Sequence, residues 1–235
     1  MSSIAAIDPI DGTPAMPLGT LILLNLAVAG SAFLAVAVLP ALLPVLANSW
    51  LGSAPKAYWY LSRSSALVAF GLLWFAMALG LVITNKLARV WPGGPTAFEL
   101  HQLASLLGLD LAMFHGLILL GDRYMNFSLA QVLVPFATLG YRPLWTGLGQ
   151  IAFYLCVLVG LSFYARRYIG QKTWRRLHYL SFAVFGLSLI HGLMSGTDSS
   201  TPWVQGMYLA SGASLLFLTV YRVLVTAAKP ARRRA

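Results

Sequence analysis

The chain has 235 residues, of which 59% are hydrophobic and only 9% are charged. This balance, with a mean hydropathy of +0.77, excludes an ordinary water-soluble domain and predicts an integral membrane protein. A formal net charge of +10 can indicate nucleic-acid binding, but in a membrane protein it is explained by topology and by attraction to anionic lipid. We therefore expect the lipid bilayer as a partner, and no nucleic acid.

Six apolar stretches are long enough to cross about 30 Å of hydrocarbon. They lie near residues 18–46, 58–84, 97–120, 144–167, 174–195 and 203–226. The first contains Pro40 and Pro44, which predict a kink or an early end in a re-entrant turn. Because the N-terminus lacks the basic residues of a signal peptide, this stretch is expected to be retained. The interpretation is one six-span domain over 18–226, between cytoplasmic tails at 1–17 and 227–235, the second of them basic.

The distribution of cations predicts the orientation. With the N-terminus in the cytoplasm, the cytoplasmic side receives Lys86, Arg89, Arg166, Arg167, Lys172, Arg175, Arg176, Arg222, Lys229, Arg232, Arg233 and Arg234. The outer side receives only Lys56, Arg63, Arg123 and Arg142. This asymmetry agrees with the positive-inside rule.

All four histidines of the chain lie in apolar stretches, where an ionisable side chain is costly and usually functional. Residues Thr96–Glu99 have the form of a capping box, and Thr173 is a second candidate helix cap. These starts place His101 and His178 five residues into their helices, at similar depth near the inner face.

The other two histidines repeat this arrangement near the outer face. His115 follows His101 by 14 residues and His191 follows His178 by 13, which is about 20 Å along each helix. A step of 14 residues returns to within about 40° of the same helix face, whereas 13 residues leave a mismatch of about 140°. Either the fifth helix is locally distorted, with Gly186 a candidate point, or its ligands approach the two levels from different angles.

Two imidazoles are too few ligands for a lone metal ion, whereas a haem iron already has four porphyrin nitrogens and needs two axial ligands. We therefore expect an all-α, six-helix transmembrane bundle with two stacked bis-histidine haems between the third and fifth helices. The chain has no CxxCH motif, so the haems are expected to be of the b type. For any one histidine, a hydrogen-bonded packing role is the alternative.

The two histidine pairs, with the segments Arg175–Gly192 and Tyr60–Trp74, resemble the ferric reductase-like transmembrane domain. That family includes NADPH oxidases, ferric reductases and the haem subunit of a bacterial periplasmic methionine sulfoxide reductase system. The resemblance implies an inner haem on His101 and His178, an outer haem on His115 and His191, and a location in the bacterial inner membrane.

Ferric reductases and NADPH oxidases carry a domain that binds flavin and nicotinamide after the sixth span, whereas only a short basic tail follows here. The expected function is therefore an oxidoreductase-type component that transfers electrons across the membrane and needs a partner for turnover. The donor would be a separate flavoprotein, a quinol or a loosely held flavin such as FMN. The acceptor would be a protein or small molecule at the outer face.

Other residues have two interpretations each. Arg63 is expected either to pair with an outer-haem propionate or to anchor its helix at the interface, and Arg175 either to meet an inner propionate or to serve as a topology charge. Asp110 points away from His101 and is expected to be a buried, hydrogen-bonded or neutral carboxyl more than a proton relay. Residues 124–145 predict an interfacial helix over the outer haem or an aromatic anchor. Close helix approach to the haems is expected at glycines, with ordinary packing as the alternative: Gly71, Gly108, Gly116, Gly186 and Gly192.

Other functional classes stay open. A haem-bearing or structural subunit of a larger complex would use the same residues without electron transfer. A transporter that uses membrane histidines would bind no haem. A cytochrome b561-like protein spreads its ligands over four consecutive spans, whereas two spans hold all four histidines here.

Overall fold

A computed structural model of the chain describes residues 14, 16–42, 57–122 and 125–228. Every regular element in these ranges is helical, and six helical segments are long and apolar enough to cross a membrane. The spans are Leu18–Val38, Ala57–Thr84, Gly94–Gly121, Pro143–Ile169, Gln171–Ser195 and Pro202–Ala227. The predicted all-helical, multi-pass architecture is therefore confirmed. Most of the two tails, and the predictions for Pro44, Lys56 and Arg123, lie outside the described residues.

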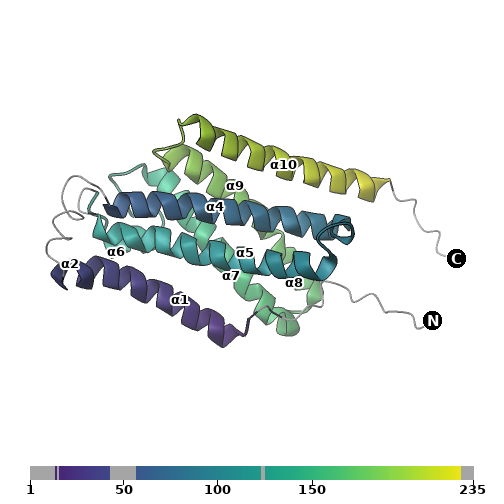
Figure 1. Ribbon diagram of the computed structural model, residues 1–235, viewed down its shortest axis with the longest axis horizontal. Coiled ribbons are helices and arrows are strands. Elements are labelled where there is room, and N and C mark those ends of the chain that lie inside the picture. Colours follow the sequence, from purple (N-terminus) through teal and green to yellow (C-terminus); the bar gives the residue numbers. More distant parts are fainter. Residues whose placement is uncertain (1–13, 15, 43–56, 123–124, 229–235) are drawn as a thin grey trace.

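The elements follow one another along the chain as up-and-down helices (Figure 1). Their bounds are α1 (Leu18–Phe33), η2 (Leu34–Val38), α2 (Leu39–Leu42), α4 (Ala57–Thr84), η3 (Leu87–Arg89), α5 (Gly94–Ile118), η4 (Leu119–Gly121), α6 (Leu129–Leu133), α7 (Pro143–Ile169), α8 (Gln171–His178), α9 (Leu180–Ser195) and α10 (Pro202–Ala227). We call the end of the bundle that carries α8 the α8 end, and the opposite end, which carries α6, the α6 end.

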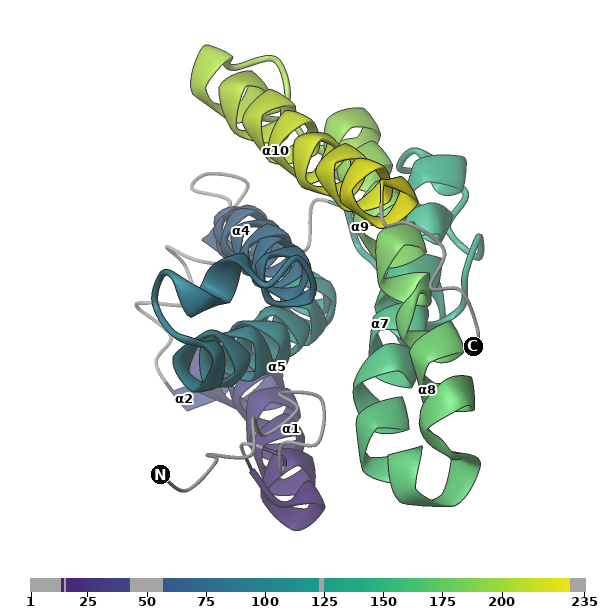
Figure 2. The same ribbon diagram turned by 90° about the vertical axis from the view of Figure 1, so that its right-hand side faces the viewer.

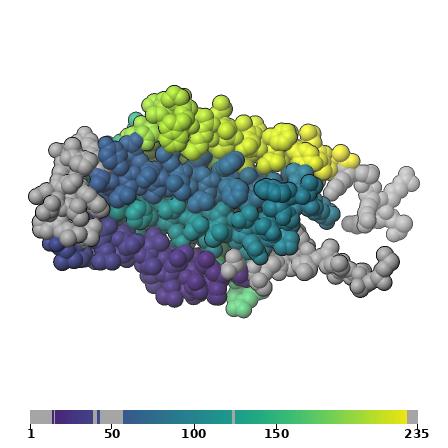
Figure 3. Space-filling model, in the orientation of Figure 1, coloured from purple at the N-terminus to yellow at the C-terminus, as the bar shows by residue number. Residues whose placement is uncertain are grey.

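The bundle consists of two packed halves. Helix α4 packs along α5, with α1 on the outer side of α5, while α7 packs along α9. Figure 2 shows these groups on opposite sides, with α10 lying across the top. From the face shown in Figure 3, α1, α5, α4 and α10 form a continuous layer. The halves pack directly where α10 and α9 meet α4 and where α5 meets α7.

A hydrophobic cluster joins α4 to α9 and α10. The Phe70 ring stacks on Phe185, with 5.6 Å between centroids, and meets Tyr208 edge-on at 4.9 Å. The indole Nε1 of Trp74 donates to the Ser214 hydroxyl at 2.9 Å. Edge-to-face aromatic contacts add to the stabilisation from burial, so this cluster fixes the position of one half against the other.

The first span is irregular before Pro40, as predicted from its prolines. A π-helical segment, Leu34–Val38, separates α1 from α2, and segments of this kind leave a backbone carbonyl without its usual helical partner. The hydroxyl of the buried Tyr58 donates to the carbonyl of Ala35 at 2.6 Å. Tyr58 therefore ties the start of α4 to this irregular turn.

Both predicted helix caps are wrong. Helix α5 begins at Gly94 after Gly93, whose φ of 103° favours glycine, and Pro95 occupies the first turn, so Thr96 lies inside the helix. Helix α8 begins at Gln171 after Gly170, with φ of 80°, so Thr173 is also internal. Glycine backbone geometry, and not a side-chain cap, sets both starts. A complete capping box does form at Ser128 and Gln131, before α6.

The fifth span is broken at Tyr179, between α8 and α9. The Phe182 amide donates to the Tyr179 carbonyl at 3.1 Å, three residues away, which is the tighter spacing of a 3-10 turn. The predicted distortion exists, but Gly186 lies within regular α9. The break lies between His178 and His191, the two histidines whose 13-residue spacing led to the prediction.

Candidate cofactor cavity

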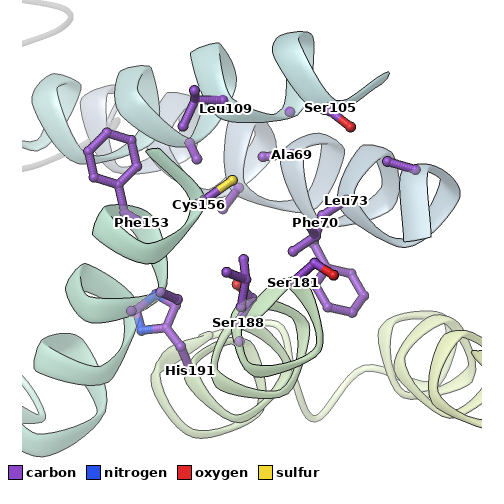
Figure 4. A pocket seen from close by; sticks show the side chains of 18 of the residues that line it. Ala69, Phe70, Leu73, Ser105, Leu109, Phe153, Cys156, Ser181, Ser188 and His191 are labelled. Atoms are coloured by element: carbon purple, nitrogen blue, oxygen red, sulfur yellow. The ribbon is translucent and has the colours of Figure 1, made fainter. Parts of the chain in front are cut away.

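A cavity of about 880 Å³ lies between the two halves. Its mostly apolar walls come from α4, α5, α7, α8, α9 and α10. Figure 4 shows its middle section, where Cys156 and Phe153 face Ala69 and Leu109 across the space. Cavities that hold drug-sized ligands or cofactors range from about 300 to 1,000 Å³, so the volume of this cavity lies in the upper part of that range.

All four histidines line this cavity and meet in two pairs. The ring centroids of His101 and His178 are 6.1 Å apart, and those of His115 and His191 are 6.2 Å apart. The first pair lies toward the α8 end and the second toward the α6 end. The predicted two levels of two are thus present, and each level joins a histidine of α5 to one of α8 or α9.

Three of the four rings are oriented by hydrogen bonds from Nδ1 to backbone carbonyls of a neighbouring helix. His101 donates to Ala76 at 2.8 Å, His115 to Ser62 at 2.9 Å and His191 to Trp145 at 2.8 Å. A donor role for Nδ1 fixes the tautomer and leaves Nε2 with a lone pair for a metal. The Ser62 hydroxyl also lies 2.8 Å from Nδ1 of His115, and it donates to the His115 carbonyl at 2.9 Å.

The antiparallel register of α4 and α5 produces two of these anchors. The acceptors Ser62 and Ala76 are 14 residues apart on α4, and His115 and His101 are 14 residues apart on α5. Because the helices run in opposite directions with the same rise per residue, one register aligns both pairs. The register therefore orients one histidine at each level.

Two glycines that were not singled out from the sequence provide room for the rings. A Cβ added at Gly149 would lie 2.5 Å from Nδ1 of His191, and one at Gly80 would lie 3.4 Å from Cε1 of His101. Of the predicted close-approach glycines, Gly108 packs α5 against Leu72, while Gly71 and Gly186 face open space. A Cβ on Gly192 would collide with the Tyr208 hydroxyl, and Gly116 makes an ordinary contact with Val132.

The histidine separation fits one metal between each pair. A metal–imidazole bond of about 2.0 Å on each side, together with the radii of two five-membered rings, puts the centroids about 6 Å apart. Two imidazoles in direct edge contact also fall in this range, so the distance alone does not identify an occupant. Among the described residues, no group of three or more His, Cys, Asp and Glu side chains could hold a metal ion. A metal here would need most of its ligands from a larger cofactor, and the cavity provides the space.

The volume of the cavity is compatible with a molecule of cofactor size. The walls are mostly apolar, so water is a poor filler. A large apolar molecule is therefore expected between the halves.

Two buried hydrogen-bond donors line the cavity without a partner among the described residues. These donors are the indole Nε1 of Trp174 and the hydroxyl of Ser195. The indole Nε1 of Trp74, in contrast, is bonded to Ser214. Trp174 lies at the α8 end and Ser195 at the α6 end. A ligand with a hydrogen-bond acceptor near each end of the cavity would satisfy both donors.

The two arginines assigned to propionates have different surroundings. The Arg63 guanidinium makes a two-point ion pair with Asp198, with Nε donating to Oδ2 at 2.8 Å and Nη2 to Oδ1. Its carboxylate partner is therefore a protein residue, and this pairing was not predicted from the sequence. Arg175 is exposed on α8 and borders the same cavity, so its side chain stays available at the α8 end.

The segment for which an interfacial helix or an aromatic anchor is predicted, residues 124–145, contains the short helix α6 at the α6 end of the cavity. Helix α6 borders the cavity through Gln131, Val132 and Leu133, and the Gln150 amide donates to two of its carbonyls at 2.7 Å each. The hydroxyl of Tyr141 donates to the Ser195 carbonyl at 2.6 Å. Burial raises the pKa of Tyr141, although Arg142 and Arg63 act in the opposite direction, so this phenol keeps its proton and its donor role.

Asp110 lies outside the cavity, as its helical angle predicted. It is buried with 5% exposure, and neither carboxylate oxygen has a hydrogen-bond partner among the described residues. The expected hydrogen-bonded state is therefore not found, whereas an uncharged carboxyl fits this environment because an unpaired ion in lipid is costly.

Comparison of the chain with protein-family models, curated proteins and solved structures gives no match. The function must therefore be inferred from the cavity and its four histidines.

Proposed function

We propose that the protein carries electrons across a membrane through two b-type haems, each held by one histidine pair. The observation that carries this proposal is the arrangement of the imidazoles. Both histidine pairs line one large apolar cavity, and within each pair the two rings are separated by the distance that a single bridging metal requires. In three of the four rings, Nδ1 is hydrogen-bonded to a backbone carbonyl of a neighbouring helix. Haem with two imidazole ligands exchanges single electrons without an open coordination position. The resemblance to ferric reductase-like domains suggests the same role.

The residues of this chain would perform distinct tasks in that role. His101 and His178 would hold the haem at the α8 end, and His115 and His191 the one at the α6 end. The backbone carbonyls behind three of these rings keep them in a metal-binding orientation. Hydrogen bonds from Trp174 and Ser195 would meet haem carboxylates, with Arg175 adding charge at the α8 end and Arg63 remaining tied to Asp198.

The charge distribution gives the proposed direction. The described cations concentrate at the α8 end of the helices, whereas Arg63 and Arg142 are the described cations of the α6 end. The positive-inside rule then puts the α8 end in the cytoplasm. An electron that moves outward is favoured by about 2.3 kcal/mol per 100 mV of potential. A flavoprotein or quinol would supply electrons at the α8 end, and an acceptor would take them at the α6 end.

The test uses purified protein in liposomes of known orientation. The unmodified chain should bind two haems and reduce an impermeant ferric acceptor on the α6 side when a donor is added on the α8 side. His101→Ala should abolish this transfer, because the first haem loses an anchored ligand. Leu103→Ala is the matched control, since Leu103 lies on the same helix, is 47% exposed and does not line the cavity. Equal transfer by His101→Ala and Leu103→Ala would contradict the proposal.

A further inference from the structure

His178 differs from the other three histidines in how its ring is held. No described residue makes a hydrogen bond to the His178 ring, whereas the other three rings are each bonded to a carbonyl of another helix. Its contacts are aromatic: Trp174 lies 5.2 Å away at 32°, and His101 lies 6.1 Å away. Trp174 belongs to the same short helix, one turn earlier. The ring is therefore oriented by its own helix and not by a neighbouring one.

The backbone around His178 also differs. His178 is the last residue of α8, an eight-residue helix that lies between Gly170, with φ of 80°, and the break at Tyr179. Trp174 is the only buried residue of this helix, and it packs on Phe163 and under the Arg166 guanidinium of α7. A movement of α8 would therefore displace eight residues at one end of the fifth span and a single buried side chain, whereas His101 and His191 lie within the longer helices α5 and α9.

We propose that His178 is an exchangeable ligand and that the α8 end binds a small neutral diatomic molecule in its place. This inference rests on the proposed function, because it requires a haem iron between His101 and His178. With haem bound, His178 would release Nε2 as a neutral imidazole, and a carbon monoxide, nitric oxide or dioxygen molecule would take its place at ferrous iron. His101, which keeps its bond to the Ala76 carbonyl, would hold the haem.

The α6 end lacks this property. His115 is bonded to Ser62 and His191 to Trp145, and the His191 ring also fits against Gly149. Both ligands there are held by neighbouring helices, so the second haem should keep both imidazoles. The structure thus predicts one ligand-binding iron and one closed iron in the same chain.

The experiment is a carbon monoxide titration of the dithionite-reduced, full-length protein, together with its haem content and its spin state. The unmodified chain should take up one carbon monoxide for every two haems. His178→Ala should keep both haems, one of them high-spin, because anchored His101 still holds the iron, whereas His101→Ala should lose one haem. Trp174→Ala should speed carbon monoxide binding by about tenfold, at the lower end of outer-shell effects at metal sites, and Trp174→Phe should change it less.

The outcomes separate the two proposals. A purified protein without haem would overturn the proposed function and this inference together. Two low-spin haems with no uptake of carbon monoxide would overturn only the exchange at His178. Equal haem loss in His178→Ala and His101→Ala would also overturn it, because the two ligands would then be held equally.

Discussion

Gly149 shows how an absent side chain positions a candidate ligand. A Cβ at this position would lie 2.5 Å from Nδ1 of His191, the atom that donates to Trp145. At Gly80 the corresponding contact, to His101, is 3.4 Å, so an alanine there needs only a small adjustment. The two levels of the cavity therefore differ in how strictly they require glycine beside the ring.

Gly149→Ala should weaken haem binding at the α6 end by roughly 10–100-fold, because displacement of the His191 ring breaks its outer-shell hydrogen bond. The haem at the α8 end should be retained. Gly186→Ala is the control, since Gly186 lies on α9, the helix of His191, does not line the cavity and has nothing within 4 Å of an added Cβ. Haem content and the low-spin spectrum of each variant provide the measurement. Unchanged haem content in Gly149→Ala would show that the ring has room to move.

The four histidines were predictable from the sequence, but the residues that orient them were not. An ionisable side chain in an apolar stretch is visible in any sequence. In contrast, the acceptors for His101, His115 and His191 are backbone carbonyls, which every residue has. Gly149 and Gly71 look alike in the sequence, yet only Gly149 touches a histidine. These roles depend on which helices face each other.

At the scale of elements, the fifth span has a break at Tyr179, between its two histidines. The sequence predicted a distortion, because 13 residues leave the two histidines on different faces of a regular helix. It suggested Gly186, since glycine weakens helices. The structure instead has the break where polar α8 meets apolar α9.

Insertion of one alanine between Tyr179 and Leu180 should remove the haem of the α8 end alone. The insertion rotates α8 by about 100° relative to α9, which takes His178 away from His101. His191 and its acceptor on Trp145 belong to α9 and α7 and stay in register, so the second haem reports that the fold is intact. An alanine inserted after Ala228, beyond the end of α10, is the control. Two haems in the Tyr179 insertion variant would show that the break absorbs the extra residue.

At the scale of the whole molecule, hydropathy predicted the spans well but could not predict the two halves. The expected stretch 58–84 corresponds to Ala57–Thr84, and 203–226 to Pro202–Ala227, because length and apolarity are fixed by the bilayer. The pairing of α4 with α5, of α7 with α9, and the cavity between them depend on side-chain packing across helices that are all apolar. Composition does not encode that choice.

In the proposed function, haem fills the cavity between the halves and would therefore contribute to the stability of the fold. A ligand at 1,000 times its dissociation constant stabilises a protein by about 4 kcal/mol, and each kcal/mol shifts the melting temperature of a chain of 150–250 residues by about 2–4 °C. Protein produced without haem should therefore melt about 10 °C or more below the haem-loaded protein, measured by intrinsic fluorescence in the same detergent. Haem added to the His101→Ala/His115→Ala variant should restore little of this difference, because both anchored α5 ligands are missing. Equal melting temperatures with and without haem would mean that lipid or detergent supports the halves equally well, and the cavity would then have no need of a haem for its stability.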